Sequence, residues 1–224
     1  MSVILFKDRM QAGQLLAQTL MKYAGHDDVI VLGLPRGGVP VAYQVAKKLH
    51  APLDVLVVRK LGVPGWEELA MGAIASGGVR VINEGVVRSA GVSKARIEAA
   101  AAVQLKELQR RELAYRGHTG APEIEGKTVI LVDDGIATGA TIRAAVEALR
   151  QQEPKQIIIA VPTASTDSCA ILEPMVDEFV ALMMPEQFRA VGQWYEDFGQ
   201  TTDAEVTQLL AKASAREPAQ KPRA

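Results

Sequence analysis

One stretch of the chain decides how the rest is interpreted, and it reads Val129-Ile130-Leu131-Val132-Asp133-Asp134-Gly135-Ile136-Ala137-Thr138-Gly139-Ala140-Thr141. The apolar residues predict a buried strand that ends in two adjacent acids. Open α/β sheets bind ligands at the carboxyl ends of their strands, so both acids are candidate site residues. Gly135 permits a turn that brings the two acids together. The small residues that follow predict a helix start whose free N–H groups could cradle a phosphate.

This pattern leaves two interpretations open. An ordinary strand end followed by a helix capped by Asp or Thr would give similar residues without any ligand. Alternatively, acids beside a phosphate cradle suit a ligand with a phosphate at one end and hydroxyls or a metal-bound group at the other. A ribose 5-phosphate has that layout.

Short apolar runs alternate with helical patterns along the chain, which favours an α/β fold with a parallel sheet. We expect a doubly wound, mainly parallel sheet of about five strands with helices on both faces. The predicted strands cover residues 29–32, 53–58, 128–132, 157–161 and 179–183. We expect one domain over residues 1–212 and a disordered tail over 213–224, which is rich in Pro, Ala and charge.

The connection between the second and third predicted strands is too long for an ordinary crossover. This insertion covers about residues 60–126 and is rich in glycine at its start. We expect a loop, a hairpin around Gly77-Gly78 and a helix from Ser93 to about Arg116. A lid over the site is the favoured interpretation, and a dimerisation arm is the alternative.

Composition excludes several classes of protein. The chain has 224 residues, with 25 Lys and Arg against 26 Asp and Glu, a balance that argues against nucleic-acid binding. One cysteine, Cys169, rules out an internal disulfide framework, and the three histidines show no metal-binding spacing. No apolar run reaches the ~18 residues of a membrane span, and the N-terminus is charged too early for a signal peptide. The expected location is cytoplasmic.

The stretch from Val129 to Thr141 resembles the signature that binds 5-phosphoribosyl 1-pyrophosphate (PRPP) in type I phosphoribosyltransferases: apolar residues, two acids, a short spacer and Thr-Gly-x-Thr. The resemblance covers about residues 8–200 and extends to a phosphoribosyltransferase-like group with a long second crossover. It implies a pentosyltransferase of nucleotide metabolism that moves a phosphoribosyl group from PRPP to a nitrogenous acceptor such as a nucleobase. Pyrophosphate would be released, Mg²⁺ would be required, and the enzyme would be a homodimer.

The resemblance assigns roles to the residues of the signature. Asp133 and Asp134 would hold the ribose hydroxyls and associate with Mg²⁺. The 5′-phosphate would be bound by backbone N–H groups and hydroxyls of Ala137, Thr138, Gly139, Ala140 and Thr141.

A second glycine-containing loop follows the first predicted strand, where the family keeps its pyrophosphate loop. It reads Gly33-Leu34-Pro35-Arg36-Gly37-Gly38, and Arg36, Gly37 and Gly38 are the candidate ligands. The resemblance implies a non-proline cis peptide near Arg36-Gly37. The loop is not a P-loop, because Val39-Pro40 replaces the Lys-Ser/Thr pair.

Arg59 and Lys60 are predicted to end the second strand. Two cations at a carboxyl end are placed to contact pyrophosphate, and with Asp133 and Asp134 they make up the predicted catalytic set. The alternative is a solvated strand terminus.

The acceptor is less well defined by the sequence. Ala137 stands where enzymes acting on 6-oxopurines usually carry an acid. The family builds its acceptor pocket from a variable hood, expected here from residues 1–7 and 184–205. The segment 188–198 gathers Phe188, Trp194, Tyr195 and Phe198, which could stack a base or could simply anchor the segment.

Two other functions stay open beside transfer. A PRPP or nucleotide sensor could keep the cradle without catalysis, although the basic residues Arg36, Arg59 and Lys60 favour an enzyme. A hydrolase could use water as the acceptor.

Overall fold

A computed structural model describes residues 5–117 and 120–215. Its central sheet has five parallel strands in the order β2-β1-β6-β7-β8. These strands are β1 (Val29–Gly33), β2 (Leu53–Val55), β6 (Thr128–Val132), β7 (Gln156–Thr163) and β8 (Glu178–Met183). The strand order changes direction between β1 and β6, and ligands of such sheets bind at that point.

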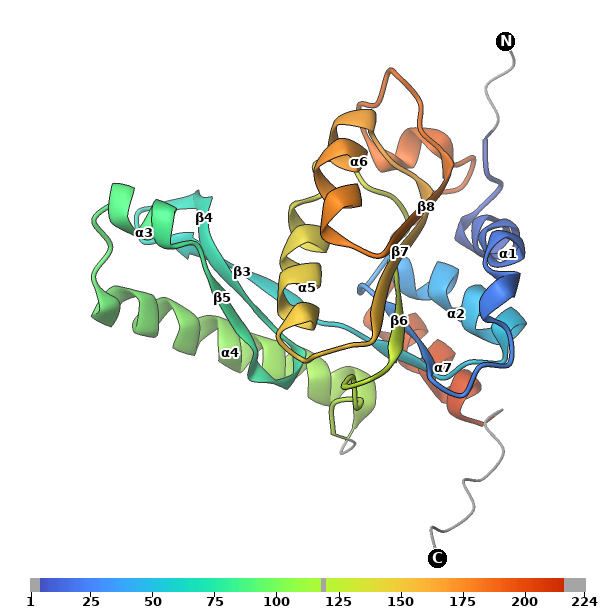
Figure 1. The fold of residues 1–224 in the computed structure, drawn as a ribbon, viewed down its shortest axis with the longest axis horizontal. Coiled ribbons are helices and arrows are strands. Elements are labelled where there is room, and N and C mark those ends of the chain that lie inside the picture. The colour runs from blue at the N-terminus through green and yellow to red at the C-terminus, as the bar shows by residue number, and fades with distance from the viewer. Residues whose placement is uncertain (1–4, 118–119, 216–224) are drawn as a thin grey trace, which may run out of the picture.

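Helices cover both faces of this sheet, as the sequence predicts (Figure 1). One face packs on α1 (Arg9–Thr19), α2 (Gly38–Leu49) and α7 (Asp203–Ser214), and the other on α5 (Ala140–Arg150) and α6 (Thr166–Leu172). Successive strand residues point to opposite faces. Ile130 and Val132 therefore join the first core, whereas Val129 and Leu131 join the second.

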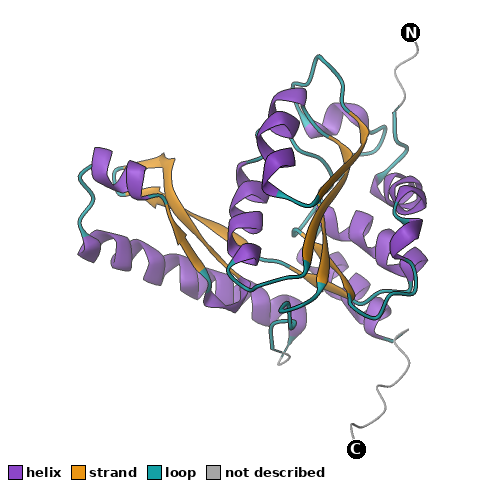
Figure 2. Cartoon of the chain, in the orientation of Figure 1, coloured by secondary structure: helices purple, strands orange, loops and turns teal. Residues whose placement is uncertain are grey.

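The long insertion forms an arm that projects from the central sheet (Figures 1 and 2). Its antiparallel sheet has the order β3-β4-β5, and two helices complete it. The arm contains β3 (Val58–Val63), β4 (Trp66–Ala75), β5 (Arg80–Ile82), α3 (Glu84–Ser89) and α4 (Lys94–Arg116). The hairpin around Gly77-Gly78 is confirmed, and both glycines adopt positive φ there. The loop expected before it is wrong, because those residues form β3 and β4.

The second predicted strand is divided between the two sheets. The central sheet keeps only β2, and the chain enters the arm through Leu56 and Val57. Val57 N–H donates to Ser76 Oγ at 2.9 Å, and this hydrogen bond holds the connecting residues against the arm. Arg59 and Lys60 consequently lie inside β3 and do not end a strand of the central sheet.

Short 3₁₀ turns fill several connections: η1 (Met21–Tyr23), η2 (Ser76–Gly78), η3 (Glu173–Met175) and η4 (Val191–Trp194). η4 lies in the segment expected to form the hood. The expected tail begins too early, since α7 continues to Ser214, and residues 216–224 lie outside the described part. No helix in the described ranges is long and apolar enough to cross a membrane.

Candidate functional site

The two acids of the signature lie against the glycine loop that follows β1. Pairing of β1 with β6 brings the ends of both strands together, and Leu34 N–H donates to Val132 O at 2.9 Å. A Cβ atom at Gly37 would lie 2.0 Å from Oδ2 of Asp134, and one at Gly38 would lie 2.8 Å from Cα of Asp133. These glycines let the loop backbone touch both acids.

The same loop contains a cis peptide bond, between Pro35 and Arg36. The expected position, near Arg36-Gly37, is one residue too late. The Arg36 side chain is exposed, and its Nη1 lies 3.9 Å from Oδ1 of Asp203. This guanidinium is therefore held loosely at the edge of the site.

Arg9, which the sequence analysis did not select, binds one of the acids directly. Its Nε donates to Oδ2 of Asp134 at 2.7 Å, and both side chains are mostly buried, with exposures of 12% and 14%. Its Nη1 donates to Gly199 O at 2.7 Å, and its Cζ lies 3.8 Å from the centre of the Phe198 ring. Arg9 thus joins α1, the acids and the hood segment.

The environment of the acids raises the pKa of both carboxyl groups. For Asp133 the main cause is burial, and the neighbouring charge of Asp134 adds to it. Burial also raises the pKa of Asp134, while the hydrogen bond and charge of Arg9 oppose the shift. Asp134 is therefore the member of the pair whose anion is directly stabilised by a cation.

The loop between the acids and α5 has the features of an anion cradle. Gly139 adopts a φ of 71° as the N-cap of α5, and the hydroxyls of Ser165 and Ser168 each donate to Ala137 O at 2.7 Å. Within the described ranges, the backbone N–H groups from Ala137 to Thr141 have no hydrogen-bond partner in the protein. These donors at a helix start favour an anionic ligand.

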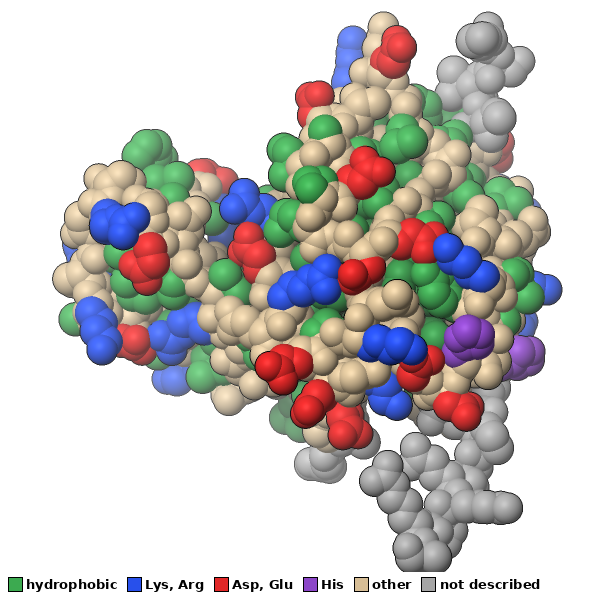
Figure 3. Space-filling view, in the orientation of Figure 1, with side chains coloured by type: hydrophobic (Ala, Val, Ile, Leu, Met, Phe, Trp, Pro, Cys, Tyr) green, Lys and Arg blue, Asp and Glu red, His purple; other side chains and the backbone are tan. Residues whose placement is uncertain are grey.

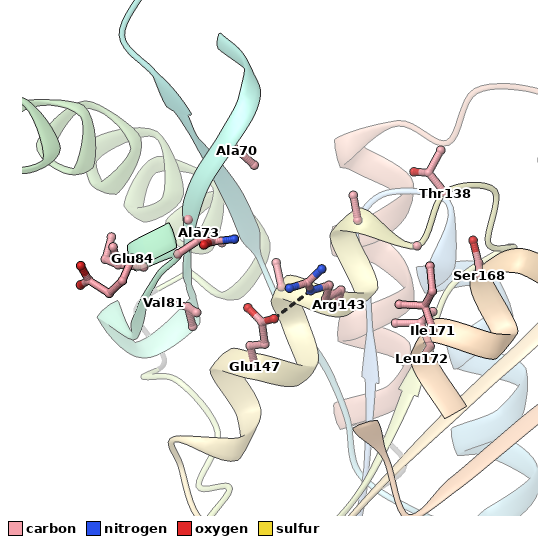
Figure 4. Close-up of a pocket in the computed structure, with 16 residues that line it drawn as sticks. Ala70, Ala73, Val81, Glu84, Thr138, Arg143, Glu147, Ser168, Ile171 and Leu172 are labelled. Carbon is pink, nitrogen blue, oxygen red and sulfur yellow. Dashed lines mark hydrogen bonds and ion pairs between the residues drawn. The ribbon is translucent and has the colours of Figure 1, made fainter. Parts of the chain in front are cut away.

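Two cavities flank the acids and the cradle. A cavity of about 390 Å³ is lined by Arg9, Arg36, Gly37, Asp134, Phe198, Gln200 and Thr201. A second, of about 570 Å³, separates the arm from α5 and α6 and includes Thr138, Gly139 and Ala140 in its wall. Figure 4 shows the second cavity, with Arg143 and Glu147 paired along α5.

A phosphoribosyl transferase domain model matches residues 7–172, which contain the cradle, both acids and the glycine loop. The chain belongs to the phosphoribosyl transferase domain family. A relative in Mycobacterium tuberculosis, named "Putative phosphoribosyl transferase", is 50% identical over 209 residues, which are 93% of this chain and 47% of that protein. The chain thus spans about half the length of this relative.

A more distant relative and a solved structure are also similar to this chain. The "Bifunctional protein PyrR" of Corynebacterium glutamicum is 29% identical over 158 residues, covering 67% of this chain and 60% of that protein. The crystal structure of TT1426 from Thermus thermophilus is 42% identical, with a TM-score of 0.84 over 93% of this chain and 98% of that one. The α/β phosphoribosyltransferase fold expected from the sequence is confirmed.

Two of the basic residues selected for the phosphoribosyltransferase site lie elsewhere in this structure. Arg59 Nε donates to Gln104 Oε1 of α4 at 3.0 Å, and Lys60 Nζ lies 3.5 Å from Oε2 of Glu68. Neither residue lines the two cavities described above. Both side chains bind within the arm, and only Arg36 of the three selected cations lies beside the acids.

The acids do not by themselves form a metal centre. No group of three or more His, Cys, Asp or Glu side chains that could hold a metal occurs in the residues described. Oδ2 of Asp134 is already taken by Arg9. This donor set does not fit a resident Mg²⁺ bound by protein ligands alone.

A buried aromatic pair joins the segment 188–198 to the start of the chain. Phe6 and Tyr195 are buried, their ring centres lie 5.5 Å apart, and the Tyr195 hydroxyl donates to Asp134 O at 2.5 Å. Burial, followed by the charge of Asp134, raises the pKa of Tyr195. Because its hydroxyl bonds to the backbone at the acids, Tyr195 connects the hood to the site.

One signal in the sequence could have revealed Arg9. It is the first residue of α1, where the positive end of the helix disfavours a cation. A basic residue at that position indicates a partner elsewhere in the fold. The sequence gives no comparable signal for Ser165 and Ser168, which support the cradle. Ser165 is the N-cap of α6, and that role alone explains a serine at this position.

Proposed function

We propose that this protein is a phosphoribosyltransferase that moves the phosphoribosyl group of PRPP to a nitrogenous acceptor and releases pyrophosphate. The observation that carries the proposal is the contact between the glycine loop and the acids, next to a cradle with unpaired N–H groups. PRPP carries a phosphate at one end, a pyrophosphate at the other and two sugar hydroxyls between them. The cradle, the two acids and the glycine loop follow one another in the same order.

Each element has a distinct part in binding PRPP. The cradle from Ala137 to Thr141 takes the 5′-phosphate, and Asp133 and Asp134 accept hydrogen bonds from the ribose hydroxyls. The backbone at Gly37 and Gly38 and the Arg36 side chain face the pyrophosphate. A sugar held at three points leaves its anomeric carbon fixed for attack, which lowers the entropic cost of the reaction.

Breaking the bond to pyrophosphate leaves positive charge on the sugar and negative charge on the leaving group. The Asp134 carboxylate next to the ribose stabilises the positive charge on the sugar, and Arg36 stabilises the negative charge on the pyrophosphate. Mg²⁺, when bound, would add neutralisation of the pyrophosphate. It would have to come with PRPP, since residues 5–117 and 120–215 contain no group of three or more His, Cys, Asp or Glu side chains that could hold the ion.

The arm is proposed as the lid of this site. Its strands β4 and β5 line one wall of the larger cavity, and the cradle lines another (Figure 4). Movement of the arm toward α5 would exclude water from the reacting carbon. The expected homodimer stays a prediction.

Pyrophosphate release from PRPP tests the proposal. Purified protein is incubated with PRPP, Mg²⁺ and one base at a time, and release is followed with a coupled pyrophosphatase. Transfer predicts release only with a suitable base, and hydrolysis predicts release without any base. Absence of both PRPP binding and release would contradict the proposal.

A PRPP sensor is the second candidate, and one observation favours it. Arg59 and Lys60 lie in the arm and not beside the acids, so a main reason to prefer catalysis is weaker than the sequence indicates. A sensor would bind PRPP in a calorimeter yet release no pyrophosphate with any acceptor. The face seen in Figure 3 mixes acidic and basic side chains, which offers no support for nucleic-acid binding there.

A further inference from the structure

The larger of the two cavities described above begins at the phosphate cradle and continues toward the arm. Its wall includes residues 138–140 of the cradle, whereas Asp134, Arg36 and Gly37 line the smaller cavity, and the two cavities have no lining residue in common. PRPP bound as proposed would place its ribose and pyrophosphate at the acids and the glycine loop. Only its 5′-phosphate would touch the larger cavity, so about 570 Å³ of space lies beyond that phosphate. This volume is typical of a ligand pocket.

A cation lies in the larger cavity, close to the cradle. Arg143 belongs to the first turn of α5, where the positive end of the helix disfavours a cation. Its Nε donates to Oε1 of Glu147 at 2.9 Å, and its side chain is 53% exposed. Figure 4 shows the Arg143 guanidinium in the space between the arm and α6. The cradle already provides for one phosphate, and this guanidinium can bind a second one.

Much of the remaining wall is apolar. The apolar side chains come from the arm, α5 and α6, and they are Ala73, Val81, Ala144, Ile171 and Leu172. Ile171 is a large apolar residue that is nevertheless 55% exposed. An organic group in the cavity would cover this side chain and remove its surface from water, which favours binding.

We propose that the larger cavity binds a group attached to the 5′-phosphate, so that the site accepts, beside PRPP, a ribose joined through a 5′-diphosphate to a further organic group. The first phosphate would lie in the cradle, Arg143 would bind the second, and the organic group would lie against Ala144 and Ile171. This inference rests on the proposed function, whose sugar substrate it extends. Movement of the arm toward α5 would close over the added group.

The charged residues of the cavity restrict the class of the organic group. Arg143, Glu147 and Glu84 line it, and Arg143 and Glu147 are paired with each other. The two carboxylates disfavour a further anion beyond the second phosphate, and they accept hydrogen bonds from hydroxyl and N–H groups. A nucleoside offers such donors together with flat faces for the apolar wall. The ligand class is therefore a ribose joined through a diphosphate to a nucleoside.

Calorimetry with ribose 5-phosphate and with ADP-ribose tests the proposal, since ADP-ribose adds a phosphate and a nucleoside to the first compound. R143Q removes the charge, and A144L fills part of the cavity. R150Q is the control for charge, because Arg150 ends α5, pairs with Asp177 and does not line the cavity. A102L is the control for size, at an exposed position of α4. Melting temperatures show whether each variant is folded.

We expect wild type to bind ADP-ribose at least tenfold more tightly than ribose 5-phosphate. R143Q and A144L should each lower the affinity for ADP-ribose at least tenfold and change the affinity for ribose 5-phosphate less than threefold. R150Q and A102L should bind both compounds as wild type does. If A144L does not fold, R143Q decides alone, because its side chain is exposed.

Three results would overturn the inference while leaving the cradle intact. Equal affinities of wild type for the two compounds would mean that the cavity adds nothing to binding. Unchanged affinity for ADP-ribose in R143Q and A144L would mean that its second phosphate and nucleoside bind elsewhere. Equal losses for both compounds in these variants would show that they disturb only the cradle. Failure of wild type to bind ribose 5-phosphate and PRPP would refute the proposed function itself, and this inference with it.

Discussion

Gly37 and Asp134 are so close that no side chain fits between them. A Cβ atom at residue 37 would lie 2.0 Å from Oδ2 and 2.7 Å from Cγ of Asp134. The residue has ordinary right-handed backbone angles, with φ −60° and ψ −33°, so only space requires glycine here. The loop after β1 and the acid after β6 therefore form one continuous surface.

G37A should displace Asp134 and weaken PRPP binding at least tenfold, because the new methyl group occupies the position of the carboxylate. The fold should persist, since alanine tolerates these backbone angles. Calorimetry with PRPP and Mg²⁺ measures the effect. G120A is the control, since nothing lies within 4 Å of a Cβ there and its φ is not positive. Equal affinities of the two variants would refute the close approach.

D134N tests the acid itself. The amide keeps the shape of the side chain but loses the charge that pairs with Arg9 and would attract the ribose hydroxyls. We expect loss of most PRPP affinity with an unchanged circular dichroism spectrum. D28N serves as the comparison, because Asp28 forms an ion pair with Lys155 (2.7 Å between Oδ2 and Nζ) and this pair lies away from the site. Unchanged PRPP affinity in D134N would contradict the role assigned to this carboxylate.

Arg9 should contribute to stability as well as to the site. Removing one partner of a buried ion pair typically costs ~3–5 kcal/mol, because the other charge stays buried. R9A should lower the free energy of unfolding by about that amount, and R9K by less, since lysine keeps the charge but not the stacking on Phe198. Urea denaturation measures both.

A double-mutant cycle measures the interaction energy between Arg9 and Asp134 apart from their other contacts. If Arg9 and Asp134 stabilise each other, R9A combined with D134N should cost clearly less than the sum of the two single changes. K155A, which breaks an exposed pair with Asp28, should cost no more than ~1 kcal/mol. Additive effects at Arg9 and Asp134 would show that their contact carries little energy.

The sequence predicts the parts of this protein that depend on local pattern. Apolar runs define the five strands, and the adjacent acids and the small residues after them define the cradle. Gly77 and Gly78, with φ of 80° and 76°, mark the hairpin correctly. These features follow from which conformations and environments each residue tolerates.

The features that the sequence did not predict depend on contacts between distant residues. Arg9 reaches Asp134 only because α1 packs against the carboxyl end of the sheet, and no local rule specifies that pairing. Arg59 was misplaced because residues 53–58 look like one strand, although the chain changes sheets at Leu56 and Val57. Continuous hydrophobicity does not reveal which sheet a residue joins.

R59A tests whether the arm carries Arg59 to the reaction. In this structure Arg59 binds Gln104, so it can contact pyrophosphate only if the arm moves. We expect R59A to lower kcat for pyrophosphate release more than it weakens ribose 5-phosphate binding, which needs only the cradle and the acids. Q104A keeps the guanidinium and should retain most of kcat. Equal losses of kcat and binding in R59A would indicate a structural role in the arm.

Tyr115 should make the stability of the protein fall at alkaline pH. The residue is 4% exposed, and burial together with a 2.8 Å hydrogen bond to Asp203 raises its pKa to about 12. The folded state then keeps the phenolic proton at pH values where the unfolded chain, with a pKa near 10, has lost it. Stability from this group is complete below pH ~10 and is lost as the pH rises toward 12, with a slope of ~1 kcal/mol per pH unit. Urea denaturation between pH 8 and 12 should show a steeper decline for wild type than for Y115F, which has no proton to lose. Parallel curves for the two proteins would mean that Tyr115 titrates alike in the folded and unfolded states.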